Sequence, residues 1–115
     1  MRPIISILIV IRNAAQHIIP CIQSIETQFE LDDVAWELIV VDGLSSDASK
    51  LVTQTYLKEV SYIWTILDNP KKTLASGWNI GIQHAKGQFI LRPDAHARLH
   101  PNYVRYGLAL LSARP

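Results

Sequence analysis

An aspartate and a histidine near the end of the sequence are spaced as a pair of metal ligands could be. Asp94 and His96 stand in the segment LRPDAHA, directly after the apolar run Phe89, Ile90, Leu91. In extended backbone, residues two apart point to the same side, so this carboxylate and imidazole can face one cation. The oxygens of a diphosphate and water would complete the coordination, with Mn²⁺ expected and Mg²⁺ as the alternative. The other interpretation is that Asp94 caps a turn and His96 lies on the surface.

Polar residues also follow three earlier apolar runs. They are Asn13 after the first run, Asp42 and Gly43 after the second, and Asp68 and Asn69 after the third. Ligands of open parallel sheets bind outside the carboxyl ends of the strands, so these residues and the metal-ligand pair could share one site. Turn formation and helix capping are the ordinary uses of such residues. The set, more than any one member, favours a binding site for a polar ligand.

The segment VVDGLSSDAS has the chemistry of a nucleoside site. Asp42 can accept hydrogen bonds from ring N–H or hydroxyl groups, and Gly43 lets the backbone approach a ligand closely. Neither DGLSSD nor GWNIG supplies the G-x-G-x-x-G pattern after the first strand, and no G-x-x-x-x-G-K-[ST] loop is present. NAD and ATP bound in the familiar ways are therefore not expected.

These residues need a parallel sheet to bring them together, and the sequence predicts one. Short runs rich in β-branched residues recur as Ile4–Ile11, Leu38–Val41, Ile63–Leu67 and Phe89–Leu91. Helical segments separate these runs, so the predicted order is β-α-β-α-β-α-β-α. Strands that are apolar throughout indicate an α/β fold with a mostly parallel sheet flanked by helices.

The helices are predicted from spacing and capping. The first carries Ile18, Ile22, Ile25 and Phe29 on one face, with Pro20 in its first turn. A second follows SSDAS and is expected to bury Leu51, Val52, Thr55 and Leu57. A third ends at HAKG, where Lys86 would complement the helix dipole and Gly87 would adopt the left-handed cap conformation. A fourth is expected around Val104 to Leu111.

Composition excludes several classes of protein. The chain of 115 residues is 49% hydrophobic with a net charge of +1, so one domain over residues 1–115 is expected, and no basic stripe suggests nucleic acid. A lone Cys21 suits a reducing compartment, the cytosol. The opening MRPIISILIVI faintly resembles a secretory signal, but Arg12 interrupts it and a buried strand explains it as well. No run reaches the roughly 20 apolar residues of a membrane span.

The motifs, taken in order, resemble a known family. ISILIVIRN, WELIVVDGLSSDAS and NPKKTLASGWNIGIQHAKGQFILRPDAHA are similar to the nucleotide-binding half of the inverting glycosyltransferases of family two, which have the Rossmann-like GT-A fold. The resemblance covers almost the whole chain. It is greatest to the bacterial branch that builds exopolysaccharides such as succinoglycan, in which the Asp-x-Asp metal motif appears as Asp-x-His.

The resemblance implies roles for particular residues. The first strand and its loop would line the base pocket, Asp42 would hydrogen-bond the uracil ring, and the segment Gly77 to Gly81 would pass beside the sugar-diphosphate. Asp47 matches a later acidic residue, near the nucleotide in the family or simply a helix cap. The implied nucleotide-binding residues are Ile11, Asn13, Asp42, Gly43, Asp47, Gly77, Asn79 and Asp94, and the implied metal ligands are Asp94 and His96.

Two positions depart from the family pattern. Family members commonly have an acidic residue after the asparagine of the first loop, where this chain has Ala14. They often have arginine before the second asparagine, where this chain has Trp78. Nucleotide contacts from both positions are therefore in doubt, and Trp78 is expected to fill the core, with stacking on a sugar as the alternative.

A general base for sugar transfer is missing from the later part of the sequence. After Asp94 there is no Asp or Glu, and in the family the base lies in an acceptor-binding half that would follow. We expect either a deliberately shortened chain, a truncated gene product or a fragment that needs a partner. Self-association through the exposed edge is expected as well.

The leading hypothesis is therefore that this chain is the donor-binding part of an inverting, metal-dependent glycosyltransferase. We expect it to be cytoplasmic, including the inner face of the membrane. Its donor would be a UDP-sugar, and the acceptor would be a saccharide or a lipid-linked molecule. Two alternatives remain open: a non-catalytic nucleotide-binding or assembly module, and a different α/β enzyme such as a phosphoryl-transfer enzyme.

Overall fold

The protein is an α/β unit built on four parallel strands. The computed structural model describes residues 3–29, 34–99 and 104, so the helix predicted around Val104 to Leu111 lies outside the described residues except for its first position. The strands are β1 (Ile5–Ile11), β2 (Trp36–Asp42), β3 (Ile63–Asp68) and β4 (Phe89–Leu91). All four runs predicted as strands are confirmed, with β2 longer than its purely apolar part because Trp36, Glu37 and Asp42 continue the pairing.

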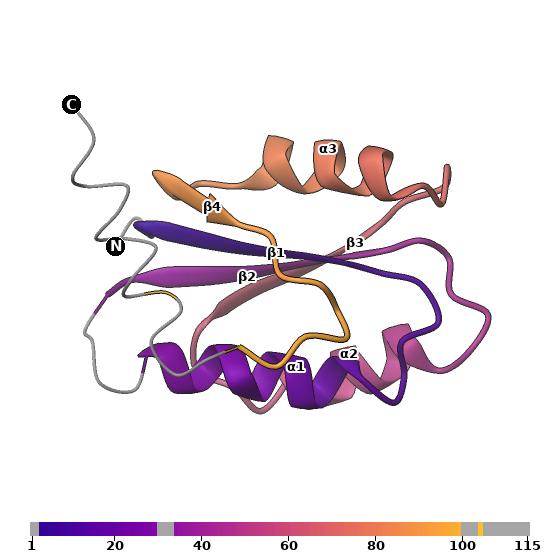
Figure 1. The fold of residues 1–115 in the computed structure, drawn as a ribbon, viewed down its shortest axis with the longest axis horizontal. Helices are drawn as coiled ribbons and strands as arrows, with labels where there is room; N and C mark the ends of the chain where they lie inside the picture. The colour runs from indigo at the N-terminus through magenta and orange to yellow at the C-terminus, as the bar shows by residue number, and fades with distance from the viewer. Residues whose placement is uncertain (1–2, 30–33, 100–103, 105–115) are drawn as a thin grey trace.

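The strands lie in the order β3-β2-β1-β4, and every described pairing is parallel. In this register Ile11 lies beside Asp42, and Asp42 lies beside Asp68. The carboxyl ends of the three longer strands are therefore level with one another. The short strand β4 stops beside Ile7 of β1, and the chain after Leu91 leaves the sheet toward the side covered by α1 (Ile18–Glu26) and α2 (Ser49–Leu57) (Figure 1).

Alternating side chains of β1 build two cores, one on each face of the sheet. Ile5, Ile7, Ile9 and Ile11 point to the face covered by α1 and α2. Leu8 and its neighbours point to the face covered by α3 (Leu74–His84). Figure 1 shows the resulting three layers, with α3 on one side of the sheet and α1 and α2 on the other. A strand covered on both faces explains why the run is apolar at successive positions.

Helix α1 forms as its spacing predicts. Ile18, Ile22 and Ile25 are fully buried, and Pro20 is in the first turn, where its missing N–H removes no helical hydrogen bond. The chain then tightens into a 3₁₀ helix, η1 (Thr27–Phe29). Phe29 packs beside Trp36 with its ring centroid 4.4 Å away.

The buried face of α2 was predicted correctly only in part, since Leu57 is buried and Val52 packs partly buried against the core, but Leu51 and Thr55 are not. Leu51 is 65% exposed and Thr55 is also exposed, whereas Ser49, Thr53 and Leu57 are fully buried. These three residues are four apart and so share one face of the helix. The hydroxyls can be buried because they are hydrogen-bonded: Thr53 donates to the carbonyl of Ser49 at 2.7 Å, and Ser49 accepts from the amide of Ala14 at 2.7 Å. Apolar spacing alone could not reveal such a face.

The prediction of a left-handed Gly87 is wrong. No described glycine has a positive φ, and α3 ends at His84 with Ala85 as an extended cap. Gly87 is required for another reason, because a Cβ there would lie 2.7 Å from the backbone nitrogen of Ser6 and 2.8 Å from the carbonyl carbon of Ile5. Its amide donates to Ser6 Oγ at 2.9 Å, which holds the start of β4 against β1.

We predict that Gly87→Ala destabilises the protein by about 1–3 kcal/mol, because the added methyl meets backbone atoms that cannot rotate away. Gly43→Ala is the matched control, since the nearest atoms to its added Cβ are 3.5 Å away. Urea unfolding of both variants measures the difference. Equal midpoints for the two variants would contradict the prediction.

Candidate active site

The loops after β1 and β2 are joined by hydrogen bonds at the carboxyl edge of the sheet. The side-chain oxygen of Asn13 accepts from the amides of Ser46 at 2.8 Å and Asp47 at 3.2 Å, and the amide of Asn13 donates to Ser45 Oγ at 2.9 Å. Asn13 has a φ of 55°, a left-handed conformation that asparagine tolerates better than most residues. The side chain predicted to bind the nucleotide therefore connects two loops.

Asp47 lies just before Ala48, the N-cap residue of α2, and binds the first residue of that helix. Its carboxylate accepts from the amide of Ser49 at 2.9 Å, from the Ser49 hydroxyl, and from the amide of Ala15 at 3.2 Å. The hydrogen bond from the Ser49 hydroxyl is the largest of the effects that lower the pKa of Asp47 below its ordinary value of 3.8. These contacts match the capping alternative, and a contact of Asp47 with a nucleotide stays a prediction.

Asp42 is buried at the tip of β2, with an exposed fraction of 2%. Its two carboxylate oxygens accept from the hydroxyl of Ser45 at 2.6 Å and from the amide of Ser45 at 3.2 Å. An ionised carboxylate has about four acceptor positions, so these two hydrogen bonds do not exhaust Asp42. Gly43 follows it, also buried, and its amide donates to the carbonyl of Ile11 at 2.8 Å.

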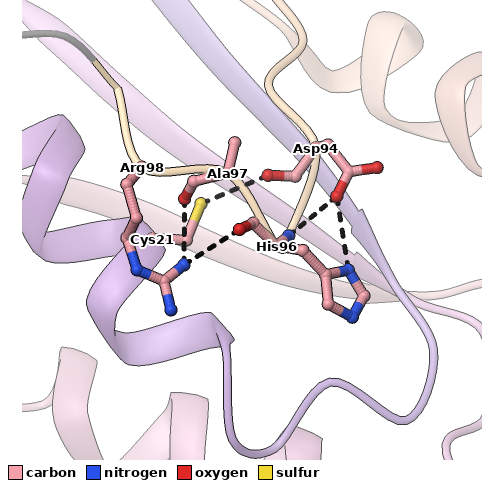
Figure 2. A network of polar contacts seen from close by, with 5 residues as sticks. All are labelled: Cys21, Asp94, His96, Ala97 and Arg98. Carbon is pink, nitrogen blue, oxygen red and sulfur yellow. Dashed lines mark hydrogen bonds and ion pairs between the residues drawn. The ribbon is translucent and has the colours of Figure 1, made fainter.

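Asp94 and His96 do face one another, but across a turn and not along the extended backbone that was expected, because the amide of Ala97 donates to the carbonyl of Asp94 at 2.9 Å. His96 Nδ1 lies 3.3 Å from Asp94 Oδ1, and the amide of His96 donates to the same oxygen at 2.8 Å (Figure 2). That amide hydrogen bond is the main cause of the lowered pKa of Asp94. The two side chains are 76% and 57% exposed, respectively, so both are open to a ligand from solvent. These contacts match the alternative in which Asp94 caps a turn and His96 lies on the surface, and a metal ion at the pair stays a prediction.

The loop that carries this pair is held in place from several directions. Arg98 Nη1 donates to the carbonyls of His96 at 3.1 Å and Ala97 at 3.0 Å, and the thiol of Cys21 lies 3.5 Å from the carbonyl of Asp94 (Figure 2). Burial raises the pKa of the Cys21 thiol to about 11, so it remains a neutral donor. The backbone of the loop is therefore fixed although its acidic and imidazole groups are exposed.

A hollow of about 200 Å³ lies beside the pair. Its lining comes from the end of β1, the loop before α3 and the loop after β4: Val10, Ile11, Arg12, Ala14, Lys72, Leu74, Asp94, Ala95 and His96. Sites that enclose a drug-sized ligand measure roughly 300–1,000 Å³, so this hollow suits one part of a larger polar ligand. Ile11, Asp94 and His96 are the predicted site residues that line it.

Arg12 and Lys72 give this hollow two cationic side chains that the sequence patterns did not single out. Lys72 has a φ of 65°. Together with Asn13 and Leu44, which have φ values of 55°, it gives each of the three loops after β1, β2 and β3 one left-handed residue. Left-handed backbone is costly for residues other than glycine, and such strain clusters at functional sites. Asn13 is of a type that adopts this conformation readily, whereas no local pattern marks Leu44 or Lys72.

Gly77 and Asn79 lie elsewhere on α3. Gly77 is buried, and a Cβ there would lie 2.7 Å from the side chain of Val10, so its small size lets α3 approach β1. Asn79 is exposed and lines a separate hollow of about 280 Å³ with Asn69 and Ser76 among its neighbours. The structure therefore does not bring these two residues to the hollow beside Asp94, and their contact with a nucleotide stays a prediction.

Trp78 packs partly buried against the core beneath α3, as expected. Its exposed side is covered by Arg92, whose guanidinium carbon lies 4.4 Å from the ring centroid.

A larger hollow of about 410 Å³ is lined by Phe29, Trp36 and Tyr62 among others. The indole of Trp36 lies against the rings of both Phe29 and Tyr62, so the aromatic surfaces there are largely used on one another.

A family comparison decides what class of protein carries this site. The model of the glycosyl transferase family 2 matches residues 6–115. The chain belongs to glycosyltransferase family 2. The family resemblance of the motifs is thereby confirmed, and the Asp94–His96 pair stands in a glycosyltransferase domain.

Individual relatives of this family 2 chain are distant and longer. It is 29% identical over 101 residues to EpsH of Bacillus subtilis, covering 88% of this chain and 28% of EpsH. Its fold matches the mannosyltransferase PcManGT from Pyrobaculum calidifontis, in complex with GDP-Man and Mn²⁺, with a TM-score of 0.88 and 22% identity over 100% of this chain and 34% of the other.

A third comparison is also a distant match to a longer protein. Glucosyl-3-phosphoglycerate synthase from Mycobacterium tuberculosis, in complex with Mn²⁺, UDP and glucosyl-3-phosphoglycerate, gives a TM-score of 0.72 at 20% identity. The match covers 97% of this chain and 40% of that one. The GT-A fold expected for a family 2 chain is thus confirmed, and the chain spans less than half the length of each protein compared.

Within the described part of this family 2 domain, no three His, Cys, Asp or Glu side chains lie together as a group able to hold a metal ion. Any ion at the Asp94–His96 pair would therefore take most of its ligands from water or substrate. Among the same residues, no helix is both long and apolar enough to cross a membrane.

We predict that Asp47 contributes to the acid sensitivity of folding. Because the folded pKa of Asp47 lies below the unfolded one, its stabilisation is present above about pH 3.8 and is lost as the pH falls through the folded value. Thermal unfolding of Asp47→Asn from about pH 6 to about pH 2 should show a shallower fall in Tm than the wild type. Glu59→Gln is the control, since the Glu59 side chain has no hydrogen bond to another described residue. If Tm falls equally steeply with pH in the wild type and in Asp47→Asn, the prediction is refuted.

Proposed function

We propose that this chain binds the nucleotide-sugar donor of an inverting, metal-dependent glycosyltransferase, with a UDP-sugar as the donor. The observation that carries the proposal is the solvent-open Asp94–His96 pair beside a hollow with two cationic side chains, in a family 2 domain. Mn²⁺ in complexes of PcManGT and of glucosyl-3-phosphoglycerate synthase supports a divalent ion at such a site.

The pair fits a divalent cation by the chemistry of its donors. A carboxylate oxygen and an imidazole nitrogen suit Mn²⁺, and Mg²⁺ is the alternative ion. The second oxygen of Asp94, Oδ2, makes no hydrogen bond to another described residue, so it can bind the ion while Oδ1 accepts from His96. When bound, the ion would neutralise negative charge that develops on the departing diphosphate.

The remaining residues of the hollow suit the diphosphate itself. Arg12 and Lys72 bring positive charge, and Asp94 is the single acidic residue in the lining. Leu74 begins α3, whose N-terminus carries partial positive charge from its unpaired amides. These groups would orient the diphosphate so that the anomeric carbon of the sugar faces the acceptor hydroxyl.

The nucleoside would lie along the carboxyl edge of the sheet, toward Asp42. We propose that Asp42 accepts a hydrogen bond from the uracil ring with an acceptor position that Ser45 leaves open. Asn13 and Asp47 would support this part of the site by holding the two loops together. The acceptor would be a saccharide or a lipid-linked molecule, at a cytoplasmic location that includes the inner face of the membrane.

Transfer also needs a general base, and we place it outside this chain. No Asp or Glu follows Asp94, and the chain spans 28% of EpsH. The second candidate function follows from the same observation: a module that binds the donor nucleotide without transferring sugar. Donor binding without turnover when acceptors and the remaining part of a longer protein are supplied would favour this second function.

We predict that UDP and Mn²⁺ bind together and that Asp94→Ala weakens UDP binding in the presence of Mn²⁺ by about tenfold or more, because the metal loses a protein ligand. Isothermal titration of UDP with and without Mn²⁺ measures this effect. Asp68→Ala is the control, since Asp68 lies at the same sheet edge but pairs with Lys50 at 2.8 Å. Absence of UDP binding in a folded wild-type sample, or equal affinities for the two variants, would overturn the proposal.

We predict that Asp42→Asn weakens UDP binding by roughly tenfold. The substitution replaces one carboxylate oxygen with an NH₂ group, so the side chain loses its charge and one hydrogen-bond acceptor. Ser45→Ala is the matched control, since it removes the hydroxyl that occupies Asp42 Oδ1 and leaves the carboxylate in place. Titration with UDP compares the two variants. If both lose affinity to the same extent, Asp42 acts by fixing the loop, and its proposed contact with uracil fails.

A further inference from the structure

The imidazole ring of His17 lies against the imidazole ring of His96. The two ring centroids are 4.3 Å apart with an angle of 47° between their planes. His17 is the N-cap residue of α1, is partly buried and makes no side-chain hydrogen bond to the helix start. Its ring is therefore available to pack on the loop that carries Asp94 and His96, and no motif in the sequence points to it.

One stripe of α1 holds that loop. His17, Cys21 and Ser24 are four and three residues apart, so they share one side of the helix. The Cys21 thiol lies 3.5 Å from the carbonyl of Asp94, and Ser24 Oγ accepts from the amide of Leu99 at 3.1 Å. These two contacts fix the loop backbone on either side of His96. They leave the side-chain rotation of His96 to be set by other groups.

The carboxylate of Asp94 orients His96 only weakly. Charge-assisted hydrogen bonds measure about 2.7–2.9 Å, and the His96 Nδ1 to Asp94 Oδ1 distance is 3.3 Å. The His96 side chain is 57% exposed, so most of its surface meets no protein atom. The ring of His17 is the described contact best placed to limit its rotation.

We propose that His17 is a positioning residue for the metal pair: its ring fixes the orientation of the His96 imidazole and so raises the affinity of the Asp94–His96 pair for a divalent cation. This inference rests on the proposed function, because it takes His96 as a metal ligand. His17 itself is not a ligand in this scheme, since the described residues contain no group of three candidate ligands. It acts through ring packing, so another aromatic ring should replace it.

Titration of the folded chain with Mn²⁺ alone, followed by electron paramagnetic resonance of the free ion, tests the inference. Loss of an orienting partner typically costs 10–100-fold in metal affinity, so His17→Ala should bind Mn²⁺ about tenfold more weakly. His17→Phe should restore the affinity to within about threefold of wild type, because it keeps an aromatic ring. His84→Ala, at an exposed position on α3, should leave the affinity unchanged.

A second measurement reports on the ring contact directly. In the metal-free protein, His17→Ala should shift the NMR signals of the His96 ring protons, because the ring current of a neighbour 4.3 Å away is removed. His84→Ala should not shift them. A change in Mn²⁺ affinity together with this shift supports the proposal.

The outcomes separate this inference from the proposed function. If wild type binds Mn²⁺, His96→Ala loses it and His17→Ala binds normally, the positioning role is refuted while the metal site stands. If His17→Phe is as weak as His17→Ala, ring packing is refuted. If wild type binds no Mn²⁺ at all, the metal site fails and this inference fails with it.

Discussion

The pairing of β1 on both of its edges determines where the loops of the site begin. β1 lies between β2 and β4, and its side chains are fully or largely buried on both faces. Because all of these pairings are parallel, the carboxyl ends of β1, β2 and β3 are level at one edge of the sheet. Ile11 is paired with Asp42, and Asp42 with Asp68, so the loops that follow these strands begin side by side at this edge.

At that edge the polar side chains fall into two groups with different tasks. Asn13, Asp42 and Asp47 spend hydrogen-bonding capacity on neighbouring loops, whereas Asp94 and His96 face mainly solvent and each other. Asp42 is buried and needs partners within the protein, whereas Asn13 and Asp47 are exposed. The hydrogen bonds of all three join neighbouring loops, so this group stabilises the edge even in the absence of a ligand. The second group remains open to solvent because the loop is held mainly through its backbone, with the hydrogen bond from the His96 amide to Asp94 Oδ1 as the one side-chain contribution of this pair to the loop backbone.

The strands and the order of elements could be predicted because β-branched apolar runs have a direct physical cause, burial on both faces of a sheet. The buried face of α2 could not, since Ser49 and Thr53 are buried by virtue of hydrogen bonds that depend on the tertiary fold. Gly87 was predicted to end a helix, but its smallness is required by the approach of β1, which no local pattern records. In the site, Asp94 and His96 meet through a turn closed by the Asp94 carbonyl and carboxylate, which a spacing of two residues does not distinguish from the extended backbone that was expected. The packing of His17 on His96 depends on how α1 crosses the sheet, and spacing along the chain carries no trace of it.

The late position of β4 in the chain has a consequence for folding. Ile5 pairs with Phe89, so most of the polypeptide must be enclosed in a loop before this pairing can form. Closing such a loop costs entropy, whereas β1, β2 and the helix between them can associate over a much shorter stretch. We therefore expect the three longer strands to assemble first and β4 to join last. The loop that carries Asp94 and His96 follows β4, so this part of the candidate site would form only at the final stage of folding.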